Sequence, residues 1–387
     1  MTTVVAGARV VTPVGVTDPG WVVVDGPRIT SVGDGLPPAE LGPVVDLGGA
    51  WLLPGFVDLH NHGGGGWTFA GGRASAAQAA ALHLDHGTTT MLASLATAPV
   101  DDMVEQVDAL AELIGPADGD GPAHQPVAGI HLEGPFLAHA RCGAHDPDLL
   151  LEPDPKVLRR LVAAGGGSVR MVTIAPELPH ALAAIRAMTT AGIIAAVGHT
   201  DATYDQATAG FDSGATVLTH AGNAMRPFHH REPGPLLAAV DARATIEVIN
   251  DGVHLHDATV RSICRQAPGR TAFITDATAA TGVGDGPGRL GDVEVEVRDG
   301  VARVVGTDTL AGSTITMDRA VHRAVTEVGL PIDVVAHAAA TAPAALLGLA
   351  AMTGRIVAGL AADLVALDDD LAPFAVMRRG TWITPPH

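Results

Sequence analysis

The chain has 387 residues, of which 47% are hydrophobic and 17% charged, with a formal net charge of −19. This composition predicts a folded protein with a sizeable core, and the strong negative charge argues against nucleic acid and anionic membranes as partners. No apolar run has the length of a membrane-spanning helix and no secretory signal is recognisable, so with only two cysteines, Cys142 and Cys264, a cytoplasmic protein is expected.

Both ends of the chain are rich in short apolar segments that are typical of β-strands. Residues 4–11 begin the series, and Asp25-Gly26 is a hairpin turn signal. Residues 362–367 repeat this pattern near the C-terminus. We therefore expect residues 1–54 and 350–387 to form one small β-sandwich domain, completed by both chain ends.

The middle of the chain alternates predicted strands and helices. The strands are predicted at residues 55–60, 88–95, 126–133, 169–175, 192–199, 215–220, 245–250 and 271–276. Helix-like segments lie between them (101–114, 178–191 and 258–266), and another at 317–328 follows the eighth strand. This alternation predicts an α/β fold, a (β/α)8 TIM barrel over residues 55–349. A hairpin is predicted at 293–305, inserted after the last strand.

Potential metal ligands stand at the ends of five of these strands. His60 and His62 end the first one, and because side chains alternate with a period of two, both imidazoles point to the same face. The later strands end in Glu133, His199, His220 and Asp276. Each histidine alone could be a polar residue of the rim. Six such residues at the mouth of one barrel point to metal-dependent chemistry.

Lysine chemistry is not expected in this protein. Lys156 is the only lysine of the chain, and it stands at the start of a predicted surface helix. A Schiff base, or a carboxylated lysine that bridges two metal ions, therefore has no candidate residue.

The sequence around these ligands forms a series of motifs. They are Pro54-Gly55-Phe56-Val57-Asp58-Leu59-His60-Asn61-His62-Gly63, His131-Leu132-Glu133-Gly134-Pro135-Phe136, Val197-Gly198-His199-Thr200, Thr219-His220-Ala221-Gly222-Asn223-Ala224-Met225, Asp251-Gly252-Val253-His254 and Thr275-Asp276-Ala277. Over nearly the whole chain this series resembles the N-acetylglucosamine-6-phosphate deacetylases of the amidohydrolase superfamily. The Glu-Gly-Pro-Phe and His-x-x-Asn-Ala-Met elements are diagnostic, whereas His-x-His is shared by the superfamily.

The resemblance implies an enzyme that hydrolyses a linear amide, the acetamido group of N-acetyl-D-glucosamine 6-phosphate, in amino-sugar catabolism. Glu133, His199 and His220 would hold one divalent ion, and His60 with His62 leaves room for a second. Zinc is the first candidate, with iron, manganese, cobalt or cadmium as the others. The ion would activate a water molecule for attack on the amide.

The resemblance also implies roles for residues around the metal. Asp276 would be the general acid and base, and the loop residue His145 would contact the substrate and steady the oxyanion. The residues implied in binding the sugar phosphate are Asn223, the Ala224 backbone, Arg231 and His254. A homodimer is implied, in which Arg231 could reach a neighbour's site. Its alternative role is a surface ion pair with Glu232.

Two other classes of function stay open at this point. Another amidohydrolase, such as an N-acyl-amino-acid deacylase or a nucleobase deaminase, would keep the metal ligands without a phosphate site. A non-catalytic scaffold with the same barrel would have no need of the ligands. The sequence departs from the family at Ala221-Gly222, where a bulkier residue is common, and this predicts a wider sugar pocket.

Overall fold

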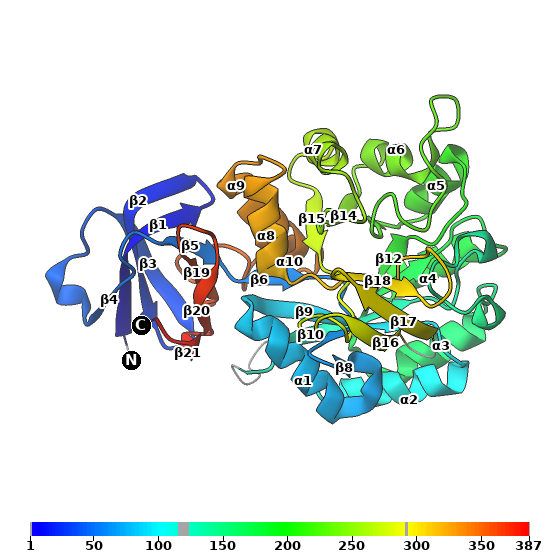
Figure 1. Ribbon diagram of the computed structural model, residues 1–387, viewed down its shortest axis with the longest axis horizontal. Coiled ribbons are helices and arrows are strands. Elements are labelled where there is room, and N and C mark those ends of the chain that lie inside the picture. Colours follow the sequence, from blue (N-terminus) through cyan, green and yellow to red (C-terminus); the bar gives the residue numbers. More distant parts are fainter. Residues whose placement is uncertain (1, 115–123, 291–292, 387) are drawn as a thin grey trace.

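The computed structural model describes residues 2–114, 124–290 and 293–386. Figure 1 shows a β-rich unit, which contains both termini, beside a larger body of strands surrounded by helices. The larger body carries every residue that the sequence predicts for the site.

Eight parallel strands form the sheet of the larger body, in the order β15-β14-β13-β12-β11-β10-β9-β6. Their bounds are β6 (Phe56–Asp58), β9 (Thr88–Ala96), β10 (Val127–Glu133), β11 (Val169–Ile174), β12 (Ile194–Val197), β13 (Val217–Leu218), β14 (Thr245–Ile249) and β15 (Thr271–Ile274). Each coincides with a predicted strand, which confirms the (β/α)8 barrel. Four strands end before the predicted ligand. Strand β6 ends at Asp58, before His60, and the other three end early because His199, His220 and Asp276 adopt φ values of 46°, 27° and 48°, outside the β region.

The barrel closes just beyond the ends of its first and last strands. Asn61 and Ala277 form a parallel bridge there. The His62 N–H donates to the Ala277 carbonyl at 2.7 Å, and the Asp276 N–H donates to the His60 carbonyl at 2.8 Å. The closure therefore places the His-x-His motif directly beside Asp276.

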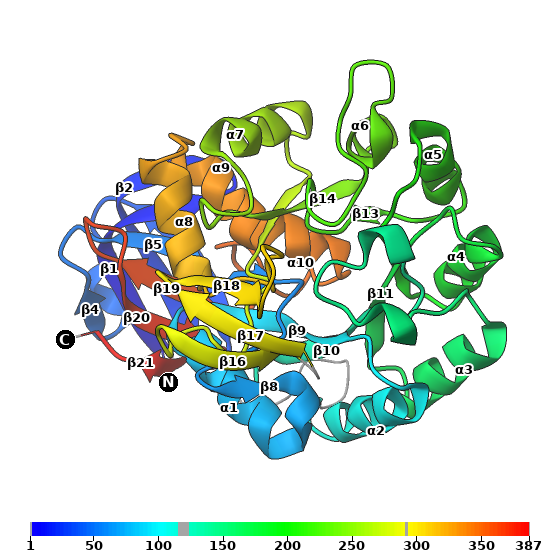
Figure 2. The same cartoon turned by 45° about the vertical axis from the view of Figure 1, so that its right-hand side comes forward.

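Ten α-helices are present in the described residues, and Figure 2 shows those of the barrel around the outside of its strands. They are α1 (Gly72–Asp85), α2 (Val100–Ala111), α3 (Pro155–Ala164), α4 (Ala181–Thr190), α5 (Tyr204–Asp212), α6 (Gly234–Asp241), α7 (Asp257–Gln266), α8 (Met317–Thr326), α9 (Ile332–Ala336) and α10 (Ala342–Leu346). Helix α3 begins with an Asp154 cap and Pro155, and α5 begins with a capping box of Thr203 and Gln206. In the described part of the chain, no helix has the length and apolar character that crossing a membrane requires.

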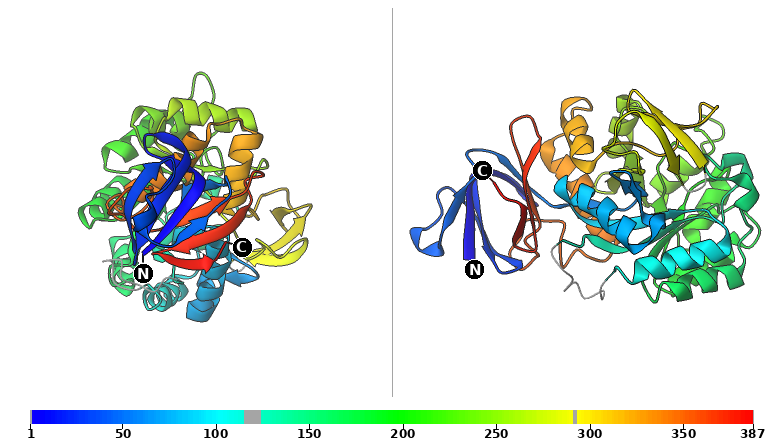
Figure 3. Two further views of the ribbon diagram at one scale, coloured as in Figure 1. Left: turned by 90° about the vertical axis from the view of Figure 1, so that its left-hand side faces the viewer. Right: turned by 60° about the horizontal axis from the view of Figure 1, so that its bottom comes forward.

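The smaller unit is a sheet built by both chain ends. Its strands are β1 (Thr2–Thr12), β2 (Gly15–Asp25), β3 (Arg28–Asp34), β4 (Val44–Asp46), β5 (Trp51–Pro54), β19 (Leu364–Leu367), β20 (Pro373–Arg378) and β21 (Thr381–Thr384). Strand β5 pairs antiparallel with β19, which joins the two ends, and Figure 3 shows the blue and red strands side by side. Val10, Leu52 and Leu364 share one buried cluster, so strands from both chain ends pack together in this unit. That residues 1–54 and 350–387 form a β-sandwich domain stays a prediction.

A small antiparallel sheet is inserted after the barrel's last strand. It contains β16 (Gly286–Leu290), β17 (Val293–Arg298) and β18 (Val301–Val304). The predicted hairpin is β17–β18, and its turn has positive φ at Asp299 and Gly300. The apolar face of this sheet packs against Ala144, next to the predicted substrate contact His145.

Candidate metal centre and active site

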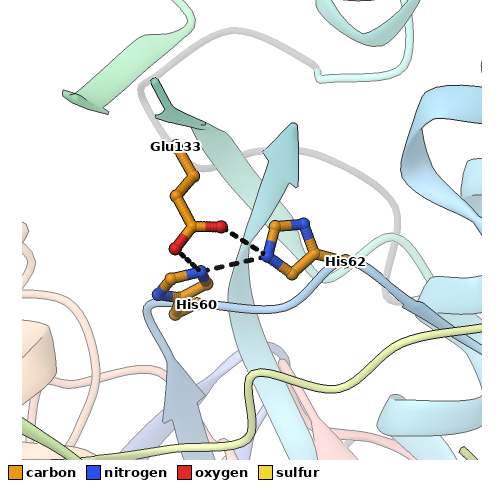
Figure 4. A group of neighbouring side chains, drawn as sticks. All are labelled: His60, His62 and Glu133. Carbon is orange, nitrogen blue, oxygen red and sulfur yellow. Dashed lines mark hydrogen bonds and ion pairs between the residues drawn. The ribbon is translucent and has the colours of Figure 1, made fainter. Parts of the chain in front are cut away.

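All five predicted metal ligands converge on one buried point, with Glu133 at its middle. The Glu133 Oε1 atom lies 3.0 Å from Nε2 of both His199 and His220 and 3.4 Å from Nε2 of His60. The Oε2 atom lies 3.1 Å from His62 Nε2. Figure 4 shows the Glu133 carboxylate facing the two imidazoles of the His-x-His motif. Glu133 is thus placed to be shared between two sets of histidines.

The backbone after Glu133 turns sharply, and this explains the Glu-Gly-Pro sequence. Gly134 has φ of 101°, and a Cβ atom at this position would come within 2.2 Å of Thr97 Oγ1. The Thr97 hydroxyl donates to the Glu133 carbonyl at 3.3 Å. Only glycine fits this turn, which ends β10 with the carboxylate aimed into the barrel mouth.

His199 and His145 carry their ring protons on opposite nitrogens. The His199 Nδ1–H donates to the Arg141 carbonyl at 2.9 Å, which leaves the Nε2 lone pair free to bind a metal ion. His145 Nδ1 instead accepts from the Thr97 backbone N–H at 3.3 Å, so its proton lies on Nε2, 3.3 Å from Glu133 Oε2. His145 is therefore a hydrogen-bond donor toward the site, although its position alone would also suit a ligand.

The charges of the centre suit a divalent cation. The pKa of Glu133 is held well below its usual range: burial alone would raise it, but His60, His145 and His199 favour the carboxylate. The pKa of His60 is raised well above normal, since Glu133 and Asp276 outweigh its burial. The nitrogen and oxygen ligand atoms of His60, His62 and Glu133 all lie within 4.8 Å of one another. Imidazole and carboxylate ligands at such spacing fit zinc and other divalent transition metals.

Asp276 lies at the same centre, beside the His-x-His motif. Its Oδ1 atom is 3.4 Å from His62 Nε2 and 3.5 Å from His60 Nε2. The Asp276 carbonyl accepts from the Ser313 N–H at 2.7 Å, so the backbone of this residue is held on both sides. Burial would raise its pKa, but His60 and His62 lower it, which keeps the carboxylate ionised and able to accept a proton.

Three of the four predicted phosphate-binding residues lie in the loops above the centre. Asn223 Nδ2 donates to the His220 and Ala221 carbonyls at 3.2 and 3.3 Å, and Ala224 follows it with φ of 44°. His254 Nδ1 lies 2.7 Å from Asp251 Oδ2, and this bond raises the pKa of His254 against the opposing effect of burial. A charged His254 would suit a phosphate group.

Arg231 is placed differently from the other predicted residues. It is exposed on the loop before α6, which projects away from the barrel in Figure 1, and its Nη1 lies 2.7 Å from His230 Nε2. Glu232 faces Arg226 at 3.5 Å, so the alternative of an Arg231–Glu232 ion pair is not what the structure has. Arg231 is not brought together with the centre of its own chain.

Ala221 and Gly222, the two small residues after His220, lie in different environments. Ala221 is fully buried in the main hydrophobic cluster, and Gly222 is exposed with φ of 87°. Any widening of the sugar pocket would therefore come from Gly222.

Sequence reasoning did not single out a polar layer inside the barrel below the metal ligands. His131 lies there, between Ser94 Oγ at 3.0 Å and Thr173 Oγ1 at 2.8 Å, with its ring edge-on to His60. Asp58 and Glu247 are both fully buried in the same region. The available signal was a polar residue at an inward-facing position of an otherwise apolar strand.

A parallel barrel that gathers His-x-His, a shared glutamate, two further histidines and an aspartate at the ends of its strands is the architecture of the metal-dependent amidohydrolases. The amidohydrolase family matches residues 51–386, and the chain belongs to this family.

Several known proteins are similar to the chain over most of its length. A mutant of N-acetyl-D-glucosamine-6-phosphate deacetylase from Mycobacterium smegmatis, solved in complex with N-acetyl-D-glucosamine-6-phosphate, is 46% identical, with a TM-score of 0.93 over 99% of this chain and 100% of that chain. N-acetylglucosamine-6-phosphate deacetylase from Bos taurus is 37% identical over 338 residues, 84% of this chain and 81% of that protein. N-acetylgalactosamine-6-phosphate deacetylase from Escherichia coli O157:H7 is 36% identical over 322 residues, 83% of this chain and 84% of that protein.

Proposed function

We propose that the chain hydrolyses the acetamido group of N-acetyl-D-glucosamine 6-phosphate to glucosamine 6-phosphate and acetate. The observation that carries the proposal is the convergence of four histidines on Glu133, with Asp276 beside two of them, in a chain 46% identical to a deacetylase solved with this sugar. We place the reaction in the cytoplasm, since Cys142 and Cys264 are both free thiols.

The ligand set supports one or two divalent ions per subunit. His199 and His220 would hold one together with Glu133, and His60 and His62 would hold a second. A divalent ion at such a site acidifies a water molecule and polarises the amide carbonyl. Zinc is the first candidate, because nitrogen-rich mixed sites suit it.

In the reaction, Asp276 would transfer a proton and His145 would donate a hydrogen bond. The Asp276 carboxylate accepts the proton of the attacking water and then delivers it to the nitrogen of the leaving amine, so no net proton is lost from the enzyme. The His145 Nε2–H, which points at Glu133, is oriented to donate to the carbonyl oxygen as negative charge develops there. The Thr97 N–H keeps this proton on Nε2.

The phosphate of the substrate would be bound by Asn223, the Ala224 backbone, His254 and Arg231. We propose that the active form is a homodimer and that Arg231 serves the neighbouring subunit's site. The supporting observation is that the loop carrying Arg231 projects outward with Phe228 59% exposed, which suits contact with a second copy of the chain.

Mixing two variants that are each impaired at low substrate concentration, one in KM and one in kcat, tests this use of Arg231 in trans. In a heterodimer of Arg231→Ala with Asp276→Asn, one site would receive an intact Asp276 from its own chain and an intact Arg231 from the neighbour. After subunit exchange at equal amounts, about a quarter of the sites would be wild type and activity should return. No recovery, with heterodimers shown by mass spectrometry, would assign Arg231 to its own subunit.

Acetate release from phosphorylated sugars by chelated and re-metallated enzyme is the experiment that tests the function. We expect no turnover after chelation and recovery with divalent ions. The galactosamine isomer should be tested beside the glucosamine one, because a relative named for it is 36% identical. Turnover of N-acyl amino acids or nucleobases without turnover of phosphosugars would favour another amidohydrolase, and a metal-free, inactive protein would favour a scaffold.

A further inference from the structure

Glu247 is a fully buried acidic residue on strand β14, directly beneath the metal centre. Its Oε2 atom lies 3.4 Å from His60 Nδ1 and accepts the His220 backbone N–H at 3.2 Å. Its Oε1 atom is buried without a hydrogen-bond partner in the described part of the chain. One carboxyl group thus touches two predicted metal ligands from different strands.

The barrel itself gives no reason for an acidic residue at this position. Ile246, Val248 and Ile249 make up the rest of the buried strand, and an apolar residue at 247 would fit the same pattern. A buried polar atom without a partner costs free energy that an apolar side chain would avoid. The contacts with His60 and His220 are what remains to explain Glu247.

We propose that Glu247 is a positioning residue that prepares His60 and His220 to bind metal. Accepting the Nδ1–H of His60 fixes the ring proton on that nitrogen, so that the Nε2 lone pair points at the shared Glu133. The same oxygen holds the backbone of His220, whose φ of 27° takes it out of the β13 ladder. The inference rests on the proposed metal centre. Glu247 itself is not one of the predicted ligands, but it would hold two of them in place.

The Nδ1 atoms of the predicted histidine ligands have different hydrogen-bond partners on the two sides of the metal centre. His199 Nδ1 donates to a neutral carbonyl, that of Arg141, and the His220 Nδ1 atom has no partner among the described residues. His60 donates to a carboxyl group, which makes an imidazole a stronger ligand than a carbonyl acceptor does. Loss of Glu247 should therefore weaken the His60–His62 side of the centre more than the His199 side.

Metal binding to Glu247→Gln and Glu247→Leu tests the inference. Zinc affinity, measured by competition with a chelator and by elemental analysis of the equilibrated protein, should fall about 10- to 100-fold for the ion on the His60 side. The effect of Gln should be smaller than that of Leu, because the amide oxygen still accepts a hydrogen bond. In the cobalt-loaded protein, the exchangeable, paramagnetically shifted proton resonance of His60 Nδ1–H should be present in wild type and absent in Glu247→Leu.

Stability of the metal-free protein separates positioning from a structural role. The melting temperature of metal-free Glu247→Gln should stay close to that of wild type, because the amide oxygen can still accept from His60 Nδ1–H and the His220 N–H, whereas Glu247→Leu leaves both donors unpaired and should lower it. Asn250→Leu is the matched control: Asn250 follows the same strand, and its Oδ1 is likewise buried and unpartnered while its Nδ2 donates to the Ala320 carbonyl at 2.8 Å. This control should lower the melting temperature and leave metal affinity unchanged.

The inference would be overturned if folded Glu247→Gln and Glu247→Leu bound every metal ion as tightly as the wild type does. So would a loss of affinity that merely follows a loss of stability and appears equally in Asn250→Leu. If Glu247→Leu does not fold, the comparison of Glu247→Gln with wild type decides. A wild-type protein that binds metal but releases no acetate would contradict the proposed function and leave the role of Glu247 standing.

Discussion

Thr275 Oγ1 donates a 2.6 Å hydrogen bond to the Asp58 carboxyl group across the seam that closes the barrel. Asp58 ends β6, two residues before His60, and Thr275 follows β15, one residue before Asp276. Burial raises the pKa of Asp58 to about 6, although the hydrogen bonds that it accepts oppose the rise. One buried contact therefore holds the His-x-His motif and the proposed general base in register.

Removing the hydroxyl of this contact should destabilise the protein. Thr275→Val keeps the shape of the side chain but leaves the buried carboxyl group without its shortest bond, at a cost of roughly 1.5–3 kcal/mol in the free energy of unfolding. Thr275→Ser retains the hydroxyl and is the matched control. Chemical denaturation of both metal-free variants measures the difference, and equal stabilities would show that the contact contributes nothing.

Much of the fold could be predicted from the sequence, because the candidate ligands stand at the ends of the predicted strands. The runs ending at Glu133 and His199 are apolar, and parallel strands bring their carboxyl ends to one edge of a barrel, so convergence of the ligands was predictable. The hairpin turn at Asp299-Gly300 was predictable for a local reason, the preference of such a pair for positive φ.

The remaining features depend on contacts between residues far apart in the sequence. Glu247 supports His60 across 187 positions, and the proton position of His145 depends on the backbone of Thr97. No local pattern contains either pair. The placement of Arg231 could not be predicted either, because its motif gives the residue type and not the direction in which its loop projects.

Asp276→Asn should preserve the fold and the bound metal while nearly abolishing turnover. The amide has the shape of the carboxylate but cannot accept and deliver the proton of the attacking water. We expect kcat to fall on the order of 10²–10⁴-fold. Steady-state kinetics together with metal analysis checks this, and a metal-loaded variant with near-normal kcat would remove Asp276 from the role.

Arg231→Ala should weaken binding of the phosphorylated substrate and leave the chemistry intact. A charge-assisted hydrogen bond of this kind contributes roughly 1.5–3 kcal/mol, so kcat/KM should fall about ten- to a hundredfold, mainly through KM. Activity on unphosphorylated N-acetylglucosamine is the internal control and should hardly change. An equal loss on both sugars would mean that the phosphate site has been assigned to the wrong residue.

Binding of the phosphosugar should depend on pH through His254. Its ordinary pKa is about 6.5. Burial opposes a charge on this imidazole, but the 2.7 Å bond to Asp251 raises its pKa in the folded protein. His254 is therefore cationic below 6.5, stays cationic between 6.5 and its raised pKa, and becomes neutral above that. Its attraction for the phosphate is present at the lower pH and is lost as the pH rises through the raised pKa, so KM should increase there.

Asp251→Asn provides the test of this pH dependence. Without the carboxylate, the pKa of His254 should fall, and the increase in KM should move to lower pH. The phosphate of the substrate also titrates, near pH 6, but identically for both proteins, so the difference between the two profiles reports His254. Superimposable profiles of KM against pH for wild type and Asp251→Asn would show that His254 does not contribute its charge to phosphate binding.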